Sequence, residues 1–249
     1  MRDLINVVLL CSFSAIVLSG CKKEEEEEPA STSAPSPQML QLSVNFRLDN
    51  VPYQLNNVIE DHVGRSAKFD RVRFLLSNLR LLRSDGSIIQ EFPGLVLKVD
   101  AGGQNTHQLG LVDQGTIDRI AFDIGLDDAT NAMSPADFSG PPLNDQSLYQ
   151  GTAQGYKFFE LTGLWDSNND LVVSSTDGPL TLISISSSMR RQKEVFVSHS
   201  HFLGQTTINL WVQMQDILNG VTLANTSSSV GSAPVNAQIM NNLQAAIYH

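Results

Sequence analysis

Cysteine is scarce in this sequence: its 249 residues include two, Cys11 and Cys21. Cys11 lies within an apolar stretch at the amino terminus, and Cys21 follows the end of that stretch. Residues 40–249 therefore contain no thiol, which excludes disulfide bonds, thiolate metal sites and cysteine nucleophiles from any domain that they form. Such a domain has to be stabilised by its hydrophobic core alone.

Basic residues are also few. The chain has 16 Lys and Arg against 26 Asp and Glu, a formal net charge of −10 at pH 7. The one basic cluster, Arg190-Arg191-Gln192-Lys193, is typical of a solvated turn between strands. Because a nucleic-acid-binding protein needs a clustered basic face, no nucleic-acid partner is expected.

Recognisable catalytic motifs are missing as well. The sequence has no nucleophile elbow, no HExxH zinc motif and no glycine-rich phosphate-binding loop. Asp127 and Asp128 are adjacent carboxylates, but no histidine or nucleophile lies beside them, and we interpret them as loop and cap residues. The prediction is a protein that is not an enzyme and has no evident organic cofactor.

A targeting signal occupies residues 1–20. Arg2 precedes an apolar stretch that is too short and too abruptly ended for a membrane span. The stretch ends in Leu18-Ser19-Gly20-Cys21, which resembles the lipobox at which bacterial lipoproteins are cleaved and acylated. We expect Cys21 to carry a lipid that anchors the protein in the outer membrane, facing the periplasm or the cell surface. The alternative is an ordinary secretory signal that happens to contain a cysteine.

Residues 21–39 read as an acidic, low-complexity tether. Lys22-Lys23 is followed by Glu24–Glu28 and then by a stretch rich in Ser, Ala and Pro. Such a composition buries too little apolar surface to fold. The Lys and Glu run also looks like the surface-export signal of Bacteroidetes lipoproteins, and a merely soluble spacer is the alternative.

The pattern of residues 40–249 is that of one β domain. Apolar and polar residues alternate over 40–48, and the same period of two recurs in short segments along the chain. A slip in the alternation at Ser77-Asn78 predicts a β-bulge. Residues 126–155 form a long irregular excursion, and a helix is expected after Pro234. The predicted fold is all-β: a single antiparallel β-sandwich domain with long loops and a short C-terminal helix.

Four sequence blocks stand in the order that is typical of the MbnP-like family, which is named after the partner protein of methanobactin systems. They are Phe74–Leu81 with Asp85-Gly86, Phe122–Leu126 with Asn131 and Pro135, Pro142–Asn144 with Gly155–Gly163, and the C-terminal helix with Asn242 and His249. Together these blocks run through nearly the whole of residues 40–249. The sequence therefore resembles this family along the entire predicted domain.

The resemblance implies a β-sandwich, copper binding in some members and often a di-haem cytochrome peroxidase-like partner. In some members that partner oxidises a tryptophan to kynurenine, which then contributes to the copper site. Here residues 148–154 contain no tryptophan, and the two in the chain are Trp165 and Trp211. The histidine-glycine pair of the family is also missing from residues 180–188. A tryptophan-derived site is therefore not favoured in this chain.

A pair of histidines is the metal candidate that the residues themselves provide. His199 and His201 are two positions apart, so on a strand they point to one face, and neutral imidazole suits copper or zinc. A stable site needs at least one more donor. The available donors are His62, His107, His249, Met189 and Met214. The alternative is that both histidines lie on an exposed strand end.

A second candidate lies between Asp166 and Asp177. Oxygen-bearing side chains occupy alternate positions from Asp166 to Asp170, and Asp177 is the twelfth residue, as in a calcium-binding loop. The sixth position of such a loop is a glycine, but here it is Leu171. A polar hairpin turn is the favoured interpretation.

These observations lead to one hypothesis and one rival. The first is a lipid-anchored, non-catalytic, metal-binding protein that resembles the MbnP-like family and prefers copper, with a di-haem peroxidase-like protein as a possible partner besides the membrane. The rival is a structural or adhesion-type surface lipoprotein that has lost the metal site.

Overall fold

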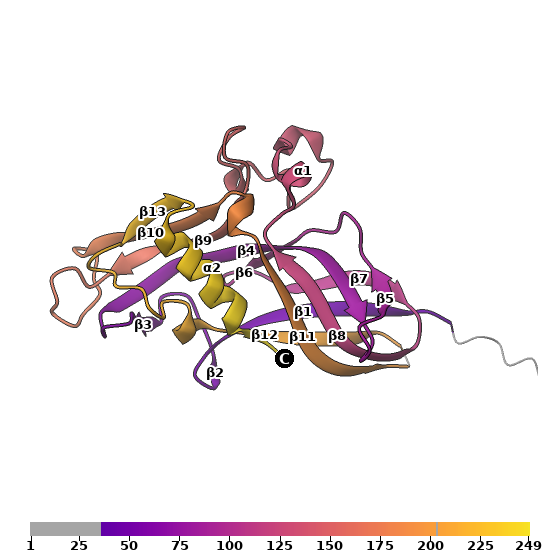
Figure 1. The fold of residues 1–249 in the computed structure, drawn as a ribbon. Coiled ribbons are helices and arrows are strands. Elements are labelled where there is room, and N and C mark those ends of the chain that lie inside the picture. The colour runs from indigo at the N-terminus through magenta and orange to yellow at the C-terminus, as the bar shows by residue number, and fades with distance from the viewer. Residues whose placement is uncertain (1–35, 203) are drawn as a thin grey trace, which may run out of the picture. The chain divides into compact units, whose positions relative to one another are not determined.

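Two β-sheets make up most of the structure, a computed structural model that describes residues 36–202 and 204–249 (Figure 1). The targeting signal, most of the tether and the predicted lipidation site Cys21 lie outside the described residues. The smaller sheet has five strands, in the order β14-β12-β1-β2 with β7 also paired to β1. They are β1 (Gln38–Leu48), β2 (Val51–Pro52), β7 (Thr106–Val112), β12 (Thr206–Gln213) and β14 (Ile247–Tyr248).

The larger sheet is built around one long strand. It has nine strands, in the order β11-β8-β4-β9-β10-β13, and β3, β5 and β6 also pair with β4. They are β3 (Val58–Glu60), β4 (Ser66–Leu82), β5 (Ile88–Glu91), β6 (Leu97–Asp100), β8 (Gly115–Ile124), β9 (Lys157–Trp165), β10 (Gly178–Ile185), β11 (Arg191–His201) and β13 (Ser228–Gly231). The predicted bulge is confirmed, because the register between β4 and β8 shifts between Ser77 and Arg80 and Asn78 has a φ of 52°.

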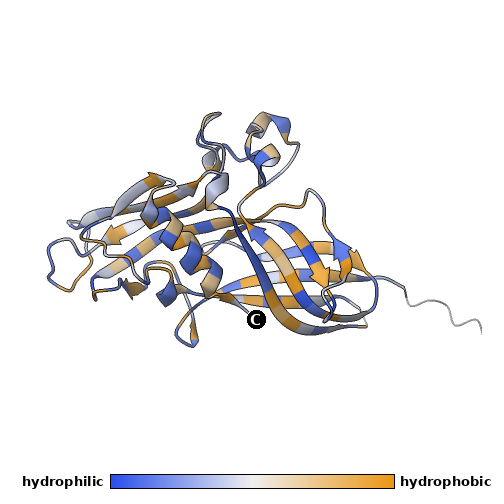
Figure 2. Ribbon diagram, viewed as in Figure 1, coloured by the Kyte–Doolittle hydropathy of each residue, from blue (hydrophilic) through white to orange (hydrophobic). Residues whose placement is uncertain are grey.

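The two sheets share one hydrophobic core. Alternate residues of β1, among them Leu40, Leu42 and Val44, are completely buried. Figure 2 shows hydrophobic and hydrophilic residues alternating along most strands. Phe46 of β1 meets Phe74 of β4 edge to face with ring centroids 6.2 Å apart. These inner side chains come from both sheets, so the predicted all-β sandwich is confirmed.

Two strand pairs differ from the antiparallel pairing that the sequence predicts. β1 runs parallel to β12 over Leu40–Arg47, and β10 runs parallel to β13 over Thr181–Ser184. The alternation of apolar and polar residues along a strand predicts which side chains are buried, but it does not indicate the direction of the neighbouring strand. The remaining pairs of named strands in the described residues are antiparallel.

The expected C-terminal helix is α2 (Pro234–Ala246), with the proline in its first turn. It contacts strands of both sheets, and Ile239, Met240 and Leu243 face the core. The four-residue spacing of apolar residues continues to Ile247, but this residue begins β14 and pairs with Val212. The helix therefore ends one residue before the apolar pattern does.

The irregular excursion contains only short helical turns. They are α1 (Asp128–Asn131) and the 3₁₀ turns η1 (Pro135–Asp137) and η2 (Gln146–Leu148). Outside the excursion, two further 3₁₀ turns are η3 (Ser187–Met189) and η4 (Met214–Asp216). Asp127 caps α1 by accepting the Thr130 N–H at 2.9 Å, which confirms its interpretation as a cap residue. No helix among the described residues is long and apolar enough to cross a membrane.

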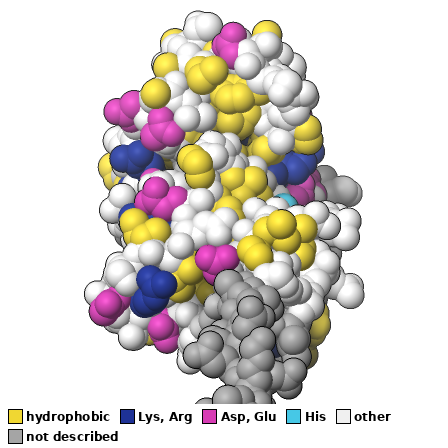
Figure 3. All heavy atoms as spheres, turned by 90° about the vertical axis from the view of Figure 1, so that its right-hand side faces the viewer, with side chains coloured by type: hydrophobic (Ala, Val, Ile, Leu, Met, Phe, Trp, Pro, Cys, Tyr) yellow, Lys and Arg dark blue, Asp and Glu magenta, His cyan; other side chains and the backbone are white. Residues whose placement is uncertain are grey.

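The surface is mixed rather than uniformly polar. On the face that Figure 3 shows, patches of hydrophobic side chains lie between acidic, basic and neutral ones. Among the exposed large apolar residues, Phe196 of β11 is 69% exposed and stacks on the guanidinium of Arg119.

Candidate functional site

The strand β11 carries both histidines of the predicted pair. Ser198 and Ser200 are exposed, whereas His199 is half-buried and His201 is fully buried. The two imidazoles therefore face the same side, as the spacing predicts, with ring centroids 6.5 Å apart and planes inclined by 32°. They face the interior of the protein and not an exposed strand end.

His201 is held by hydrogen bonds at both ring nitrogens. Its Nε2–H donates to the carbonyl oxygens of Gln38 at 3.2 Å and Val112 at 3.3 Å, and its Nδ1 bonds to the hydroxyl of Thr206. Because carbonyl oxygens only accept, Nε2 carries a hydrogen. Gln38 and Val112 belong to the opposite sheet, so His201 connects the two sheets, and a metal ion at this ring would have to displace one of these bonds.

His199 is different, because its Nε2 is buried and has no hydrogen-bond partner among the described residues. Burial lowers the pKa of His199, and the neighbouring His201 and His249 lower it further. The ring is therefore neutral at neutral pH, which is the form that binds metal ions. His249 follows β14, and it is the only other predicted donor whose charge acts on His199.

The other predicted donors lie elsewhere. His107 is on β7, opposite Leu42 of β1 and five residues from Val112, roughly 17 Å along the strand. Its Nε2 is also buried without a partner among the described residues, and burial lowers its pKa. His62 is exposed in the loop after β3. Met189 lies before the first residue of β11, at the opposite end from His199.

The loop between Asp166 and Asp177 is a polar hairpin between β9 and β10. Asp166 is completely buried and accepts the N–H groups of Asp170 at 3.1 Å and Leu171 at 3.0 Å. Asp177 accepts the N–H groups of Ser167 and Ser174. Since the loop's own backbone satisfies both carboxylates, the favoured interpretation as a hairpin turn is confirmed.

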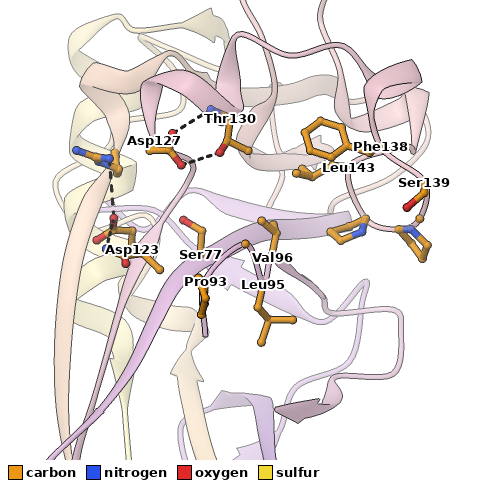
Figure 4. Close-up of a pocket in the computed structure, with 16 residues that line it drawn as sticks. Ser77, Pro93, Leu95, Val96, Asp123, Asp127, Thr130, Phe138, Ser139 and Leu143 are labelled. Atoms are coloured by element: carbon orange, nitrogen blue, oxygen red, sulfur yellow. Dashed lines mark hydrogen bonds and ion pairs between the residues drawn. The ribbon is translucent and has the colours of Figure 1, made fainter. Parts of the chain in front are cut away.

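A pocket of about 540 Å³ opens beneath the excursion (Figure 4). Its walls come from the β4 bulge, the segment between β5 and β6, and the loop from Phe138 to Leu143. On one side lie Ser77 and Asp123, and Asp127 lies near Thr130 above them. Asp123 is not among the candidate site residues that the sequence predicts, and its one signal there is an acidic residue between the apolar Phe122 and Ile124.

Comparison with known proteins identifies the family. The family model described as MbnP matches residues 37–238. The chain belongs to the MbnP family. The solved structure of MbnP from Methylosinus trichosporium is similar over 80% of this chain and 82% of that one, with a TM-score of 0.52 and 12% sequence identity. At that identity the likeness supports the fold alone. No curated protein sequence matches.

Neither tryptophan of this MbnP-family chain lies on β11 or on its partner β8, but Trp211 pairs with Tyr248, the residue before His249. Trp211 is on β12, with the guanidinium of Arg47 over its ring at 3.3 Å from the centroid. Trp165 is the last residue of β9, and the strands β8 and β4 lie between β9 and β11 in the larger sheet. Both rings have cationic neighbours, since Arg65 lies 5.7 Å from the ring of Trp165.

The residues of this MbnP-family chain fit copper only in part. Within residues 36–202 and 204–249, no group of three or more His, Cys, Asp or Glu side chains lies together as a metal site would need. What the structure does provide is the buried, unpartnered Nε2 of His199, in a ring whose pKa the neighbouring His249 helps to lower, whereas the similar Nε2 of His107 lies on β7. The donor set therefore suits a site of two imidazoles better than a cage of three or four.

Proposed function

We propose that this chain is a lipid-anchored, non-catalytic member of the MbnP family that binds a metal ion, preferably copper, at His199. The observation that carries the proposal is the Nε2 of His199, which is buried, lacks a hydrogen-bond partner among the described residues and belongs to a ring whose pKa is lowered. A buried nitrogen of this kind needs a partner, and a metal ion is one that a neutral imidazole can bind.

Copper is favoured over harder ions by the available donors. Imidazole suits copper and zinc, whereas magnesium and calcium take oxygen ligands. Copper in its monovalent state accepts as few as two ligands, which His199 and His249 can supply. His201 serves as a positioning residue in this proposal, because its bonds to the smaller sheet fix the strand of the larger sheet that carries His199.

The remaining parts of the proposal follow from the amino terminus and the family. We place the anchor at Cys21 and the protein at the outer membrane, on its periplasmic or outer side. A di-haem cytochrome peroxidase-like protein is the proposed partner, and co-purification with such a protein would support it.

Titration of the chain from Lys22 onward with copper(I) and zinc(II) tests the metal site. We expect one copper ion to bind with a dissociation constant below about 1 μM, equivalent to roughly 8 kcal/mol. His199→Ala should abolish this binding and His249→Ala should weaken it. His62→Ala is the matched control, because His62 is an exposed imidazole in the loop after β3, which β4 and β8 separate from β11 in the larger sheet, and this variant should bind copper as the unaltered chain does.

A second candidate is a structural or adhesion-type surface lipoprotein without a metal. Two observations favour it: both ring nitrogens of His201 already have protein partners, and the described part of the chain has no cluster of three donors. If neither metal binds more tightly than about 1 μM, roughly 8 kcal/mol, the metal proposal is overturned and this second function takes its place.

A further inference from the structure

Asp123 is a buried carboxylate whose hydrogen-bonding capacity is only partly used. Its side chain is 3% exposed, and its Oδ1 has no partner among the described residues. Its Oδ2 accepts a hydrogen bond from Asn78 at 3.3 Å, and a guanidinium nitrogen of Arg190 lies 3.9 Å away. A buried charged oxygen without a donor is costly, so such an atom in a folded protein calls for an explanation.

The pocket beside Asp123 has the size and lining of a small-molecule site. Its volume of about 540 Å³ lies within the range of known ligand pockets. The side chains opposite Asp123 are largely apolar and include Leu95, Val96, Phe138 and Leu143. A ligand that combines an apolar body with one hydrogen-bond donor would satisfy both parts of this lining.

The charges around the pocket favour a cation. Asp123 and Asp127 line it on the acidic side, and Arg190 is the one basic residue of the lining. Although burial opposes ionisation of Asp127, hydrogen bonds from Thr130 hold the pKa of that carboxyl below its ordinary value. With both carboxylates ionised, the three side chains carry a net charge of one negative unit, which a single positive charge would neutralise.

We propose that this pocket binds a small organic cation. A protonated amine or a guanidinium pairs with the carboxylate of Asp123, and its aliphatic or aromatic body packs on the apolar wall. A divalent metal ion fits less well, because hard cations need several ligands gathered around one point, and no group of three His, Cys, Asp or Glu side chains lies together within the described residues. The proposal does not depend on metal binding at His199, because it rests on a different set of residues.

The test is a titration of the chain from Lys22 onward with n-butylammonium and n-butylguanidinium, followed by NMR of the protein, with neutral n-pentanol as the matched probe. Asp123→Asn should weaken binding of the cations about tenfold or more, since it removes the charged acceptor. Asp128→Asn removes the same charge from an exposed neighbour outside the pocket and should leave binding unchanged.

Arg190→Gln provides a result that a folding defect cannot imitate. This change removes the one positive charge of the lining, so it should tighten cation binding severalfold while n-pentanol binding stays the same. The proposal is overturned if neither cation binds at about 10 mM, weaker than roughly 3 kcal/mol of binding free energy. It is also overturned if n-pentanol binds as tightly as the cations, or if Asp123→Asn binds them unchanged in a chain that still melts cooperatively.

Discussion

At the scale of single residues, the buried polar side chains divide into those that are satisfied and those that are not. Asn236 donates to the carbonyl of Ile183 at 2.8 Å, and Glu160 is enclosed by Arg73 and Lys157. These groups stabilise the fold. Asp123 is buried and His199 is half-buried, and each keeps a buried atom without a partner among the described residues. Unpartnered buried atoms are a liability for stability, and they are therefore where we expect ligands to bind.

The lowered pKa of His199 predicts how stability depends on pH. Burial disfavours the charged ring, so the folded protein releases this proton more readily than the unfolded chain, where the ordinary value is 6.5. Stability contributed by the neutral ring is fully present above that value and is lost as pH falls toward the lower folded pKa. His107 acts in the same direction.

Urea unfolding at a series of pH values between about 7.5 and 5.5 measures this effect, in a range where carboxyl groups stay ionised. The free energy of unfolding should fall as pH falls. His199→Gln should flatten part of that slope, and His62→Gln, which replaces an exposed ring, is the control. A slope that is identical with and without His199 would contradict the assignment.

At the scale of elements, packing is close where strands of the larger sheet pair. Gly163 of β9 lies opposite Phe69 of β4 and beside a register shift between Phe69 and Arg71. A Cβ at Gly163 would overlap the backbone carbonyl oxygen of Lys68, which cannot move without disturbing the strand pair. Glycine is therefore required here by the approach of two backbones and not by a turn.

Gly163→Ala is expected to destabilise the protein by about 2 to 3 kcal/mol through overpacking. Gly140→Ala is the matched control, because a Cβ there meets nothing within 4 Å and its backbone is not left-handed, so the change should stay within about 0.5 kcal/mol. Chemical denaturation of both variants measures the difference. Equal stabilities would mean that β4 and β9 can separate at this point at little cost.

The sequence predicts some elements and not others, for physical reasons. Alternation of apolar residues predicts β1 and the bulge at Asn78, because both depend on neighbours along the chain. It does not predict that β1 pairs in parallel with β12, since the partners Leu42 and Ile208 are far apart in sequence and the pattern has no direction. Ile247 continues the helical spacing, yet pairing with Val212 draws it into a strand.

The candidate sites could be predicted only in part. The spacing of His199 and His201 predicts that they share a face of the strand. It cannot show that both ring nitrogens of His201 form hydrogen bonds, to Gln38, Val112 and Thr206. Asp123 is a single acidic residue in an apolar strand. Its importance arises from a pocket that segments far apart in the sequence build around it.

At the scale of the whole described unit, the two candidate sites lie toward opposite ends of the same strand pair. Asp123 on β8 pairs with Gln192 near the start of β11, and His199 pairs with Ile117 near its other end. Their partners on β8, Asp123 and Ile117, are six positions apart, a distance of roughly 20 Å along the strand, and β11 has a register shift just before His199. The sites share no residue, and paired strands between them are packed in the common core.

This separation predicts that the two sites act independently. Effects of changes more than about 10 Å apart, without shared partners, usually add to within about 0.5 kcal/mol. His199→Ala should therefore leave n-butylammonium affinity unchanged, and Asp123→Asn should leave copper affinity unchanged. Saturation with copper should shift the dissociation constant of the amine by less than about threefold, a value that corresponds to the same limit. A larger shift of this dissociation constant, in either direction, would mean that β8 and β11 adopt two conformations and that each ligand binds one of them more tightly. In that case the strand pair would couple the sites, and the affinities would have to change reciprocally by the same factor.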